Sequence, residues 1–340
     1  MQPGLEALWA PKSVLGLYTE EAPIITRLWW YCFVAIQLAN GPVLVHIGTM
    51  DLVGRIFRPP SEADSLLLQV TVGCAHNRCA YCDMYRDKQF RPKSWDVIER
   101  DLQEASRMGR RFKRVFLCDG DALVLSTRRL LRILNGIRSY MPWVERVGVY
   151  GDTRCVNPKS AAELSLLRDA GLGIVYHGVE SGDDVTLSNI DKGGSRAGCV
   201  ETAAKLRTAG IVHSVIVLLG IAGKARSAEH ARATATLLTE MDPQFVGALT
   251  TTVLPGTPLH EQVAQGQFEL PDKFDMLREL RTIIAESEFS KCRFSSNHAS
   301  NYLPLRMNLP QDQGMALATL DKILCAGDER RLRPEWARGL

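Results

Sequence analysis

The chain has 340 residues, of which 46% are hydrophobic, so it can bury one large core or two ordinary ones. Its 41 basic and 38 acidic side chains leave a formal charge of +3, too small to suggest nucleic acid or an anionic membrane as a partner. Nine cysteines are too few for a disulfide framework at this length. Three of them fall within residues 74–82, which favours a metal site in a reducing compartment, and we expect a cytoplasmic protein.

Residues 1–60 are expected to be an N-terminal extension, because no regular pattern runs through them. The apolar run 28–39 is shorter than the roughly 20 residues that span a bilayer, and an Asn-Gly-Pro sequence at 40–42 interrupts the apolar pattern beyond it. The run also lacks the basic leader and the cleavage site of a signal peptide. We therefore predict no membrane span, and one hypothesis makes Met50 the native start, with residues 1–49 a mistranslated leader.

From residue 65 onward, short apolar runs alternate with amphipathic segments. The runs are rich in β-branched residues and bounded by Gly, Asp or Pro, as buried strands are. The predicted strands cover residues 66–72, 115–118, 144–150, 172–179, 211–219 and 245–254. The segments between them have helical spacing: Ser94 is predicted to cap a helix that stops at Gly109, and Asn157 with Pro158 to begin another.

Six strand–helix units in series predict an α/β fold, a partial (β/α)6 barrel of the TIM type with parallel strands, over residues 61–260. A doubly wound sheet is the alternative. Residues 261–340 are expected to be a C-terminal extension of helices and loops that closes the barrel, with a last helix at 311–325. Because ligands bind at the carboxyl ends of the strands in such barrels, the site residues are expected in the loop after each strand.

The loop after the first predicted strand carries Cys74, Cys79 and Cys82. Three thiolates on one loop can hold three irons of a 4Fe-4S cluster and leave the fourth iron open to a small molecule. Thiolates also suit zinc, with His76 as a fourth ligand. Structural zinc usually takes two well-separated ligand pairs, and the sequence has no second pair, so we favour the cluster.

The triplet, with Tyr81 directly before its last cysteine, resembles the cluster motif of the radical S-adenosylmethionine (SAM) superfamily. The resemblance covers residues 65 to about 255. It implies a partial barrel of six strand–helix units, with a 4Fe-4S cluster and SAM as cofactors. Family members usually have three residues between the first two cysteines, whereas this chain has four.

The resemblance also implies cofactor contacts after the second strand. The sequence there is Asp119-Gly120-Asp121, at the position where the family binds the methionine amino end of SAM. A glycine admits close approach of the backbone, and a carboxylate accepts hydrogen bonds from an ammonium group, so these residue types suit that role. An ordinary Asp-Gly turn is the alternative.

After the fourth strand, residues 178–182 resemble the Gly-apolar-Glu-Ser-Gly signature of the branch that contains tRNA methylthiotransferases and oxygen-independent coproporphyrinogen oxidases. This implies that Glu180 and Ser181, with Gly182, bind the ribose or amino-acid part of SAM. Lys192 stands where the coproporphyrinogen oxidases carry an arginine, although lysine lacks the planar fork and a surface lysine is the better interpretation.

The loops after the fifth and sixth strands are expected at the adenine of SAM, through Leu219 with Gly220 and Leu254 with Pro255. Substrate contacts are expected from two further places. Asp152 and Arg154 follow the third strand, although they could equally pair with each other at the rim. The polar stretch containing Asn297, His298 and Asn301 could fold over the barrel mouth, with a solvated surface loop as the alternative.

The reaction implied by the resemblance is reductive cleavage of SAM, after which a 5′-deoxyadenosyl radical takes hydrogen from the substrate. A one-electron donor of the flavodoxin or ferredoxin type is implied, and we expect a small-molecule substrate and no nucleic-acid partner. The remaining cysteines lack cluster spacing, which argues against the second cluster of a methylthiotransferase. A non-catalytic iron–sulfur sensor or carrier and a zinc-stabilised TIM-like enzyme stay open as alternatives.

Overall fold

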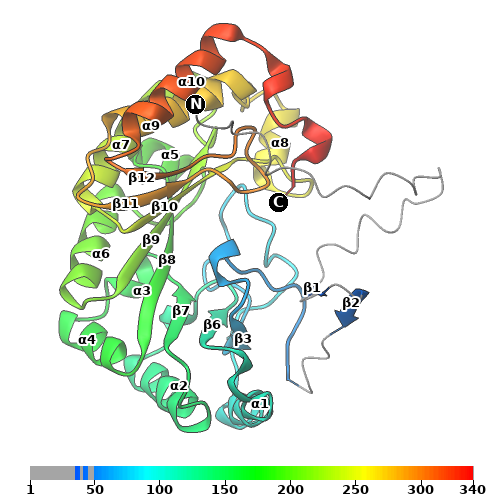
Figure 1. Cartoon of the computed structure of the whole chain (residues 1–340), viewed down its shortest axis with the longest axis vertical. Helices are drawn as coiled ribbons and strands as arrows, with labels where there is room; N and C mark the ends of the chain where they lie inside the picture. The colour runs from blue at the N-terminus through cyan, green and yellow to red at the C-terminus, as the bar shows by residue number, and fades with distance from the viewer. Residues whose placement is uncertain (1–34, 39–40, 45–49, 340) are drawn as a thin grey trace, which may run out of the picture. The chain divides into compact units, whose positions relative to one another are not determined.

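The computed structural model of the chain describes residues 35–38, 41–44 and 50–339 (Figure 1). The chain divides into two units, residues 1–46 and residues 47–340. The first contains an antiparallel pair, β1 (Ala35–Leu38) and β2 (Gly41–Leu44). Most of the segment 1–49 lies outside the described residues, so the hypothesis of a start at Met50 stays a prediction.

The second unit is built on a sheet of eight strands, in which the six parallel strands predicted from the sequence stand side by side in chain order (Figure 1). These six are β3 (Leu66–Gln69), β6 (Arg114–Cys118), β7 (Arg146–Tyr150), β8 (Leu172–Glu180), β9 (Val212–Leu219) and β10 (Phe245–Thr250). A doubly wound sheet would reverse its strand order part-way, so the predicted parallel barrel is confirmed over this alternative. The described sheet stays open between its edge strands, which makes the barrel partial.

The helices of the second unit lie between and beyond the strands, mostly on the outer side of the curved sheet (Figure 1). They are α1 (Trp95–Arg107), α2 (Thr127–Tyr140), α3 (Thr153–Val156), α4 (Ala161–Asp169), α5 (Asp184–Asn189), α6 (Arg196–Thr208), α7 (Ser227–Met241), α8 (Pro258–Ala264), α9 (Lys273–Glu286) and α10 (Gln313–Ala326). Ser94 occupies the N-cap position of α1 as predicted, without a side-chain capping hydrogen bond, and the helix ends before Gly109.

One predicted helix start is wrong. Asn157 is the C-cap of the short helix α3 and donates its side-chain amide to the Gly198 carbonyl at 3.0 Å. The next helix, α4, begins after Ser160, whose hydroxyl accepts from the Glu163 amide while the Glu163 carboxylate accepts from the Ser160 amide. This reciprocal capping box satisfies two free helix-end donors, whereas a first-turn proline satisfies none.

Two predicted strands end earlier than expected. The run 66–72 divides into β3 and a separate strand β4 (Thr71–Val72), which pairs antiparallel with β5 (Arg91–Pro92). This short ribbon joins the two ends of the cysteine-bearing segment 73–90. The last predicted strand ends at Thr250 rather than at residue 254, and the Thr250 amide there donates to the Ser300 hydroxyl at 3.1 Å.

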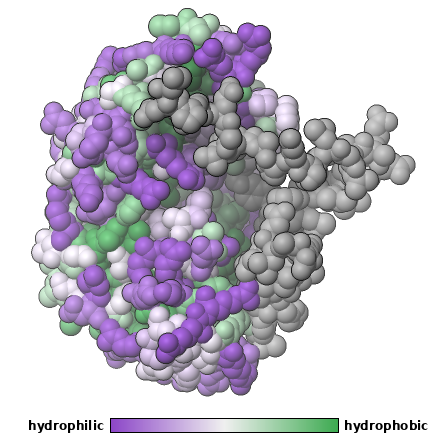
Figure 2. All heavy atoms as spheres, viewed as in Figure 1, coloured by the Kyte–Doolittle hydropathy of each residue, from purple (hydrophilic) through white to green (hydrophobic). Residues whose placement is uncertain are grey.

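The C-terminal extension adds two strands that the sequence did not predict. β11 (Cys292–Ser295) pairs parallel with β10, and β12 (Arg306–Leu309) pairs antiparallel with β11 at the sheet edge. The boundary at residue 260 stays a prediction. No helix in the described part of the chain is long and apolar enough to cross a membrane, and the face in Figure 2 is covered mainly by hydrophilic side chains.

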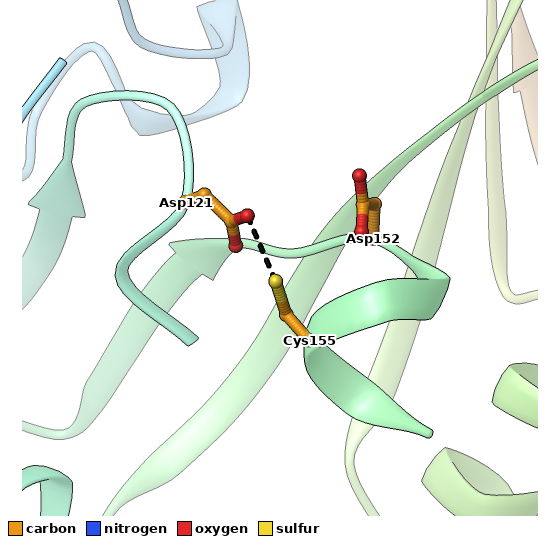
Figure 3. A group of neighbouring side chains, drawn as sticks. All are labelled: Asp121, Asp152 and Cys155. Atoms are coloured by element: carbon orange, nitrogen blue, oxygen red, sulfur yellow. Dashed lines mark hydrogen bonds between the residues drawn. The ribbon is translucent and has the colours of Figure 1, made fainter. Parts of the chain in front are cut away.

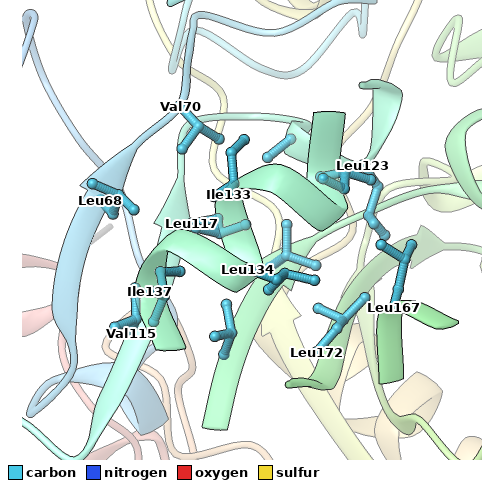
Figure 4. Close-up of a cluster of buried hydrophobic side chains, with 14 of the residues drawn as sticks. Leu68, Val70, Val115, Leu117, Leu123, Ile133, Leu134, Ile137, Leu167 and Leu172 are labelled. Carbon is cyan, nitrogen blue, oxygen red and sulfur yellow. The ribbon is translucent and has the colours of Figure 1, made fainter. Parts of the chain in front are cut away.

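Most of the hydrophobic core lies between the sheet and its outer helices. In the cluster of Figure 4, Leu68, Leu117 and Leu172 of the strands pack against Ile133 and Leu134 of α2. A second layer of apolar side chains lies on the opposite face of the sheet, where Phe116 makes edge-to-face contacts with Tyr150 at 5.0 Å and Tyr176 at 5.8 Å. The strands are therefore buried on both faces, which explains why they read as continuous apolar runs.

The amino-terminal end of the strands is closed by a buried carboxylate. Glu62, which is fully buried, pairs with Arg146 at the start of β7 and accepts a hydrogen bond of 2.5 Å from the Tyr176 hydroxyl. The polar loops that were predicted to form the site all follow the opposite, carboxyl ends of the strands.

Candidate functional site

The three cysteines of the motif lie on one loop between β4 and β5. Cys74, Cys79 and Cys82 are free and partly buried. Asn77 adopts a left-handed backbone conformation, with φ of 48°, and its amide lies 3.5 Å from the Cys74 sulfur. Asparagine tolerates this conformation better than most residues, so the fourth residue between the first two cysteines is accommodated in a tight turn.

Burial keeps these thiols protonated when no metal is bound. It raises the pKa of Cys74 and of Cys79, and it raises that of Cys82 to about 11. The thiolate is the form that binds metal, so metal must displace three protons as it binds.

The spacing of these thiols does not suit a single ion. Among the described residues, one set of three potential ligand atoms lies within 4.8 Å of one another, and it consists of Asp121, Asp152 and Cys155 rather than the loop cysteines. His76, the expected fourth zinc ligand, has its Nε2 2.5 Å from the Asp191 carbonyl oxygen. A loop with three separated thiols fits a cluster of several irons better than a tetrahedral zinc site.

Asp119 anchors the start of the cysteine loop. Its fully buried carboxylate accepts from the Gly73 amide at 2.7 Å and from Lys88 at 3.1 Å. The side-chain amide of Gln69 donates to the same oxygen at 2.9 Å. This oxygen is occupied by donors from within the protein, so we assign Asp119 to holding the loop rather than to touching a cofactor.

Gly120 allows the end of β6 to approach the first cysteine. A side chain here would place its Cβ 2.6 Å from the Cys74 Cβ and 3.0 Å from the Cys74 Cα, closer than real Cβ contacts come. The Gly120 amide also donates to the Gly73 carbonyl at 3.2 Å. The glycine predicted from the sequence is therefore required by close packing on Cys74.

A cavity of about 430 Å³ adjoins the cysteine loop. Its lining residues come from the cysteine loop and the ends of β6 and β7: Ala75, His76, Arg78, Asp121, Val124, Arg154 and Cys155. The structure thus brings the cysteine loop to the same cavity as Asp121, which was predicted at the cofactor, and Arg154, which was predicted at the substrate. Cys155 was not predicted, because nothing in its local sequence distinguishes it from a buried apolar residue.

Asp121 presents an unpaired oxygen at this cavity. The residue is 3% exposed, its Oδ2 accepts from the Cys155 thiol at 2.8 Å, and its Oδ1 has no partner among the described residues (Figure 3). Burial, assisted by the nearby Asp152, raises the pKa of Asp121 to about 7. An unpaired buried carboxylate oxygen is costly in a folded protein unless a ligand or water binds it.

Asp152 and Arg154 pair with each other, as one of the two alternatives predicted. The Arg154 guanidinium forms an ion pair with the Asp152 carboxylate, and the Arg154 amide donates to Asp152 Oδ1 at 2.9 Å, which caps α3. Arg154 also lines the cavity, so pairing does not remove it from the site.

Glu180 and Lys192 form a largely buried ion pair at the end of β8. Lys192 Nζ lies 2.9 Å from Glu180 Oε1, and the lysine side chain is only 14% exposed, so the interpretation as a surface lysine is wrong. The turn after α5 brings Lys192 back across the strand end. Burial would lower the pKa of Lys192, but the charge of Glu180, followed by Cys79 and Asp152, outweighs it and raises the pKa, so the lysine stays charged.

Glu180 itself has a left-handed backbone, with φ of 65°. Such a conformation costs roughly 1–3 kcal/mol for a non-glycine residue and is typical of functional sites. Tyr81 lies beside this carboxylate, and burial raises the tyrosine pKa well above its ordinary value. The aromatic residue of the cysteine motif and the acidic residue of the fourth strand therefore meet.

Other residues of the predicted cofactor loops face the helices instead of the cavity. Ser181 bonds to His230 on α7 at 2.7 Å, and the Gly182 amide donates to Thr234 at 3.0 Å. Leu219 is buried, and the Gly220 amide donates to Glu279 on α9 at 2.6 Å. Leu254 and Pro255 lie in the turn before α8.

The predicted substrate loop lies at the end of β10. Asn301 is 2% exposed and bonds to the Thr250 hydroxyl and the Ala248 carbonyl, both at 2.8 Å. His298 Nδ1 lies 2.9 Å from the Ser300 hydroxyl, and with its side-chain amide turned to present oxygen, Asn297 accepts from Arg306. The side chain of Asn301 is therefore engaged in holding the loop onto the strand.

The family model of the radical SAM superfamily matches residues 68–233, which contain the cysteine loop and the ends of five strands. The chain belongs to the radical SAM superfamily. No curated protein sequence matches the chain.

Solved structures of radical SAM proteins resemble this one. The methyltransferase TsrM from Kitasatospora setae, with tryptophan and a SAM analogue bound, aligns with a TM-score of 0.50 and 20% identity over 60% of this chain and 39% of its own. The methylornithine synthase PylB aligns with a TM-score of 0.46 and 16% identity over 66% of this chain and 63% of its own. The Escherichia coli coproporphyrinogen III oxidase HemN aligns with a TM-score of 0.48 and 15% identity over 65% of this chain and 52% of its own. The chain thus spans about 40–60% of the length of these proteins, and the likeness to TsrM supports a shared fold.

Membership of the radical SAM superfamily implies a 4Fe-4S cluster and SAM as cofactors, and the residues present fit them. Three thiols on one loop leave one iron of a cluster without a protein ligand. The unpaired Asp121 oxygen offers an acceptor and the charged Lys192 a cation, which are the two kinds of group that bind a zwitterionic methionine.

Proposed function

We propose that this radical SAM protein is an enzyme that cleaves SAM reductively and removes a hydrogen atom from a small-molecule substrate. A 4Fe-4S cluster held by Cys74, Cys79 and Cys82 would supply the electron that breaks the carbon–sulfur bond of SAM and gives a 5′-deoxyadenosyl radical. The observation that carries the proposal is the cavity beside the cysteine loop, since it joins that loop to Asp121 and Arg154.

In this proposal, Asp121 accepts hydrogen bonds from the amino group of the methionine part of SAM through its unpaired Oδ1. Lys192 has two tasks. Its charge would offset the negative charge of three thiolates, and as the one basic side chain among the residues predicted at the cofactor it would pair with the methionine carboxylate. Glu180, paired with it, faces the ribose or the amino-acid part.

The adenine of SAM would lie toward the turns at Gly220 and Leu254–Pro255, which follow β9 and β10. Gly220 adopts a left-handed backbone with φ of 80°, a conformation that favours glycine, and the turn that it makes would present its backbone to the adenine. Ser181 and Gly182 support this side of the site from behind, because both bond to α7.

The substrate would enter over Arg154 and Cys155, with the loop of Asn297 and His298 at the rim of the strand ends. A small molecule suits a cavity of about 430 Å³. A one-electron donor of the flavodoxin or ferredoxin type would reduce the cluster. The Gly-Val-Glu-Ser-Gly motif at 178–182 supports a place in the branch of methylthiotransferases and coproporphyrinogen oxidases.

The test is anaerobic reconstitution with iron and sulfide, followed by dithionite and SAM, with 5′-deoxyadenosine as the measured product. We expect product from the native protein and none from Cys79→Ala. Cys325→Ala is the matched control, because Cys325 is exposed on α10 and should leave the yield unchanged. A reduced cluster that yields no 5′-deoxyadenosine would contradict the proposal and favour an iron–sulfur sensor or carrier.

A further inference from the structure

Glu279 on α9 supports one of the proposed SAM loops from behind. This carboxylate is 2% exposed and lies beyond the segment 68–233 that the family model matches. Its Oε2 accepts from the Gly220 amide at 2.6 Å, and its Oε1 accepts from the Ser227 hydroxyl at 2.6 Å. The carboxylate therefore ties the turn after β9 to the first turn of α7 and to the C-terminal extension.

His230 lies between Glu279 and the loop after β8. The Ser181 hydroxyl accepts from the Asp183 amide at 3.0 Å and lies within hydrogen-bond distance of His230 Nδ1, at 2.7 Å. Burial lowers the pKa of His230 to about 4, so the ring is neutral. His230 Nε2 lies 3.8 Å from Glu279 Oε2, beyond hydrogen-bond distance, and has no hydrogen-bond partner among the described residues. Gly220 with Glu279 and Ser181 with His230 thus form two hydrogen-bonded pairs that lie side by side in one buried polar line.

The two loops also pack closely on these helices. A Cβ at Gly220 would lie 2.8 Å from the Met276 Cε on α9, and one at Gly182 would lie 2.2 Å from the Ala233 carbonyl oxygen on α7. Because dense interiors transmit displacements, a shift of α9 would move the turn at Gly220 with it.

We infer that Glu279 is a positioning residue for SAM, which presets the turn at Gly220 through a direct hydrogen bond. This inference rests on the proposed function. It makes the C-terminal extension part of the cofactor site rather than a cover over it. The expected consequence is on SAM affinity, with the cluster left intact, because none of the residues in this line lies on the cysteine loop.

The experiment measures SAM binding to the reconstituted full-length protein by equilibrium dialysis, together with KM and kcat for 5′-deoxyadenosine. For Glu279→Ala we expect Kd and KM for SAM to rise about tenfold or more, with the iron and sulfide content of the native protein. Glu279→Gln should recover part of the affinity, since its amide oxygen can accept from Gly220. Glu286→Gln is the matched control, an exposed glutamate on the same helix, and should bind SAM like the native protein.

The outcomes separate this inference from the function it rests on. A native protein that holds a cluster but binds no SAM would contradict the proposed function itself. If the native protein binds SAM and the Kd of Glu279→Ala lies within twofold of the native Kd, the inference alone is overturned. Equal loss of cluster and of SAM binding, with no recovery in Glu279→Gln, would also overturn it, because Glu279 would then be only a structural residue. If Glu279→Ala does not fold, the SAM affinity of Glu279→Gln decides in the same way.

Discussion

The two sides of the strand ends are held in place differently. On the side of β3 and β6, the cysteine loop is fixed by the buried ion pair of Lys88 and Asp119, both from the first two strand–helix units. On the side of β9 and β10, Gly220 and Thr250 are held by Glu279 and Asn301, which come from the C-terminal extension. The comparison suggests that cluster binding depends on the barrel's own charges, whereas SAM binding depends on later parts of the chain.

The largest expected effect is on the first side. Lys88→Met leaves Asp119 buried without its cation, and breaking a buried pair costs roughly 3–5 kcal/mol. We expect reconstituted iron to fall to a small fraction of the native content, because Asp119 also holds the Gly73 amide at the start of the cysteine loop. Lys113→Met is the control, since that lysine is 71% exposed in a surface pair. If Lys88→Met kept the native iron content, cluster binding would not depend on the buried ion pair of Lys88 and Asp119.

Gly120→Ala tests the same side by packing instead of charge. The new Cβ would meet the Cys74 Cβ at 2.6 Å, so the loop must move away from β6. We expect a weakened cluster, seen as faster loss of its visible absorbance on exposure to a chelator, while SAM affinity of the remaining cluster-loaded protein changes less. Gly314→Ala on α10 has no neighbour within 4 Å and serves as the control.

Asn301→Ala is expected to have a moderate effect on the opposite side. It removes the hydrogen bonds to Thr250 and Ala248 and leaves buried polar groups unsatisfied, at a cost of about 1–3 kcal/mol. Urea unfolding should show this loss, with cluster content unchanged. The exposed Asn308 on β12 gives a matched alanine control. If Asn301→Ala lost its cluster as well, the two sides would not be independent.

The smallest expected effect concerns the strand between the two sides. His177 on β8 lies 3.2 Å from His213 on β9, and burial, followed by the charge of Lys192, lowers the pKa of His177 from 6.5 to about 4. The unfolded chain binds this proton at higher pH than the folded one. The contribution of neutral His177 to the free energy of unfolding is therefore complete above pH 6.5 and is lost as pH falls toward 4. At pH 5 about 2 kcal/mol of it has been lost.

His177→Gln should flatten this part of the pH dependence, measured as the urea midpoint at pH 7 and at pH 5. The exposed His260 provides the control substitution His260→Gln, which should keep the native slope. An unchanged slope in His177→Gln would show that the buried histidine pair does not set the acid stability of the central strands.

Sequence patterns predicted the features that are local in the chain. The cysteine spacing, the six apolar runs and the glycine after the second strand are each visible within about ten residues, and the structure places them at one end of a parallel sheet. The helix with Ser94 at its N-cap position was predictable for the same reason, since capping preferences depend on neighbouring residues.

Features that depend on tertiary contacts were not predictable. Glu279 looks like any helical glutamate, and only the fold brings it to Gly220. Lys192 reads as a surface residue until the turn after α5 carries it to Glu180. The two added strands β11 and β12 do alternate between core and solvent, but with four residues each the alternation is too short to distinguish a strand from a loop.

The strand order has a consequence for synthesis on the ribosome. Because each parallel strand pairs with the one made just before it, the sheet can assemble as the chain emerges. The cysteine loop belongs to the first of these units, whereas Glu279 is made roughly 10–40 s later at rates of about 5–20 residues per second. During that interval a nascent chain has its iron ligands in place before its SAM loops are supported, so we expect metal loading to be able to precede completion of the protein.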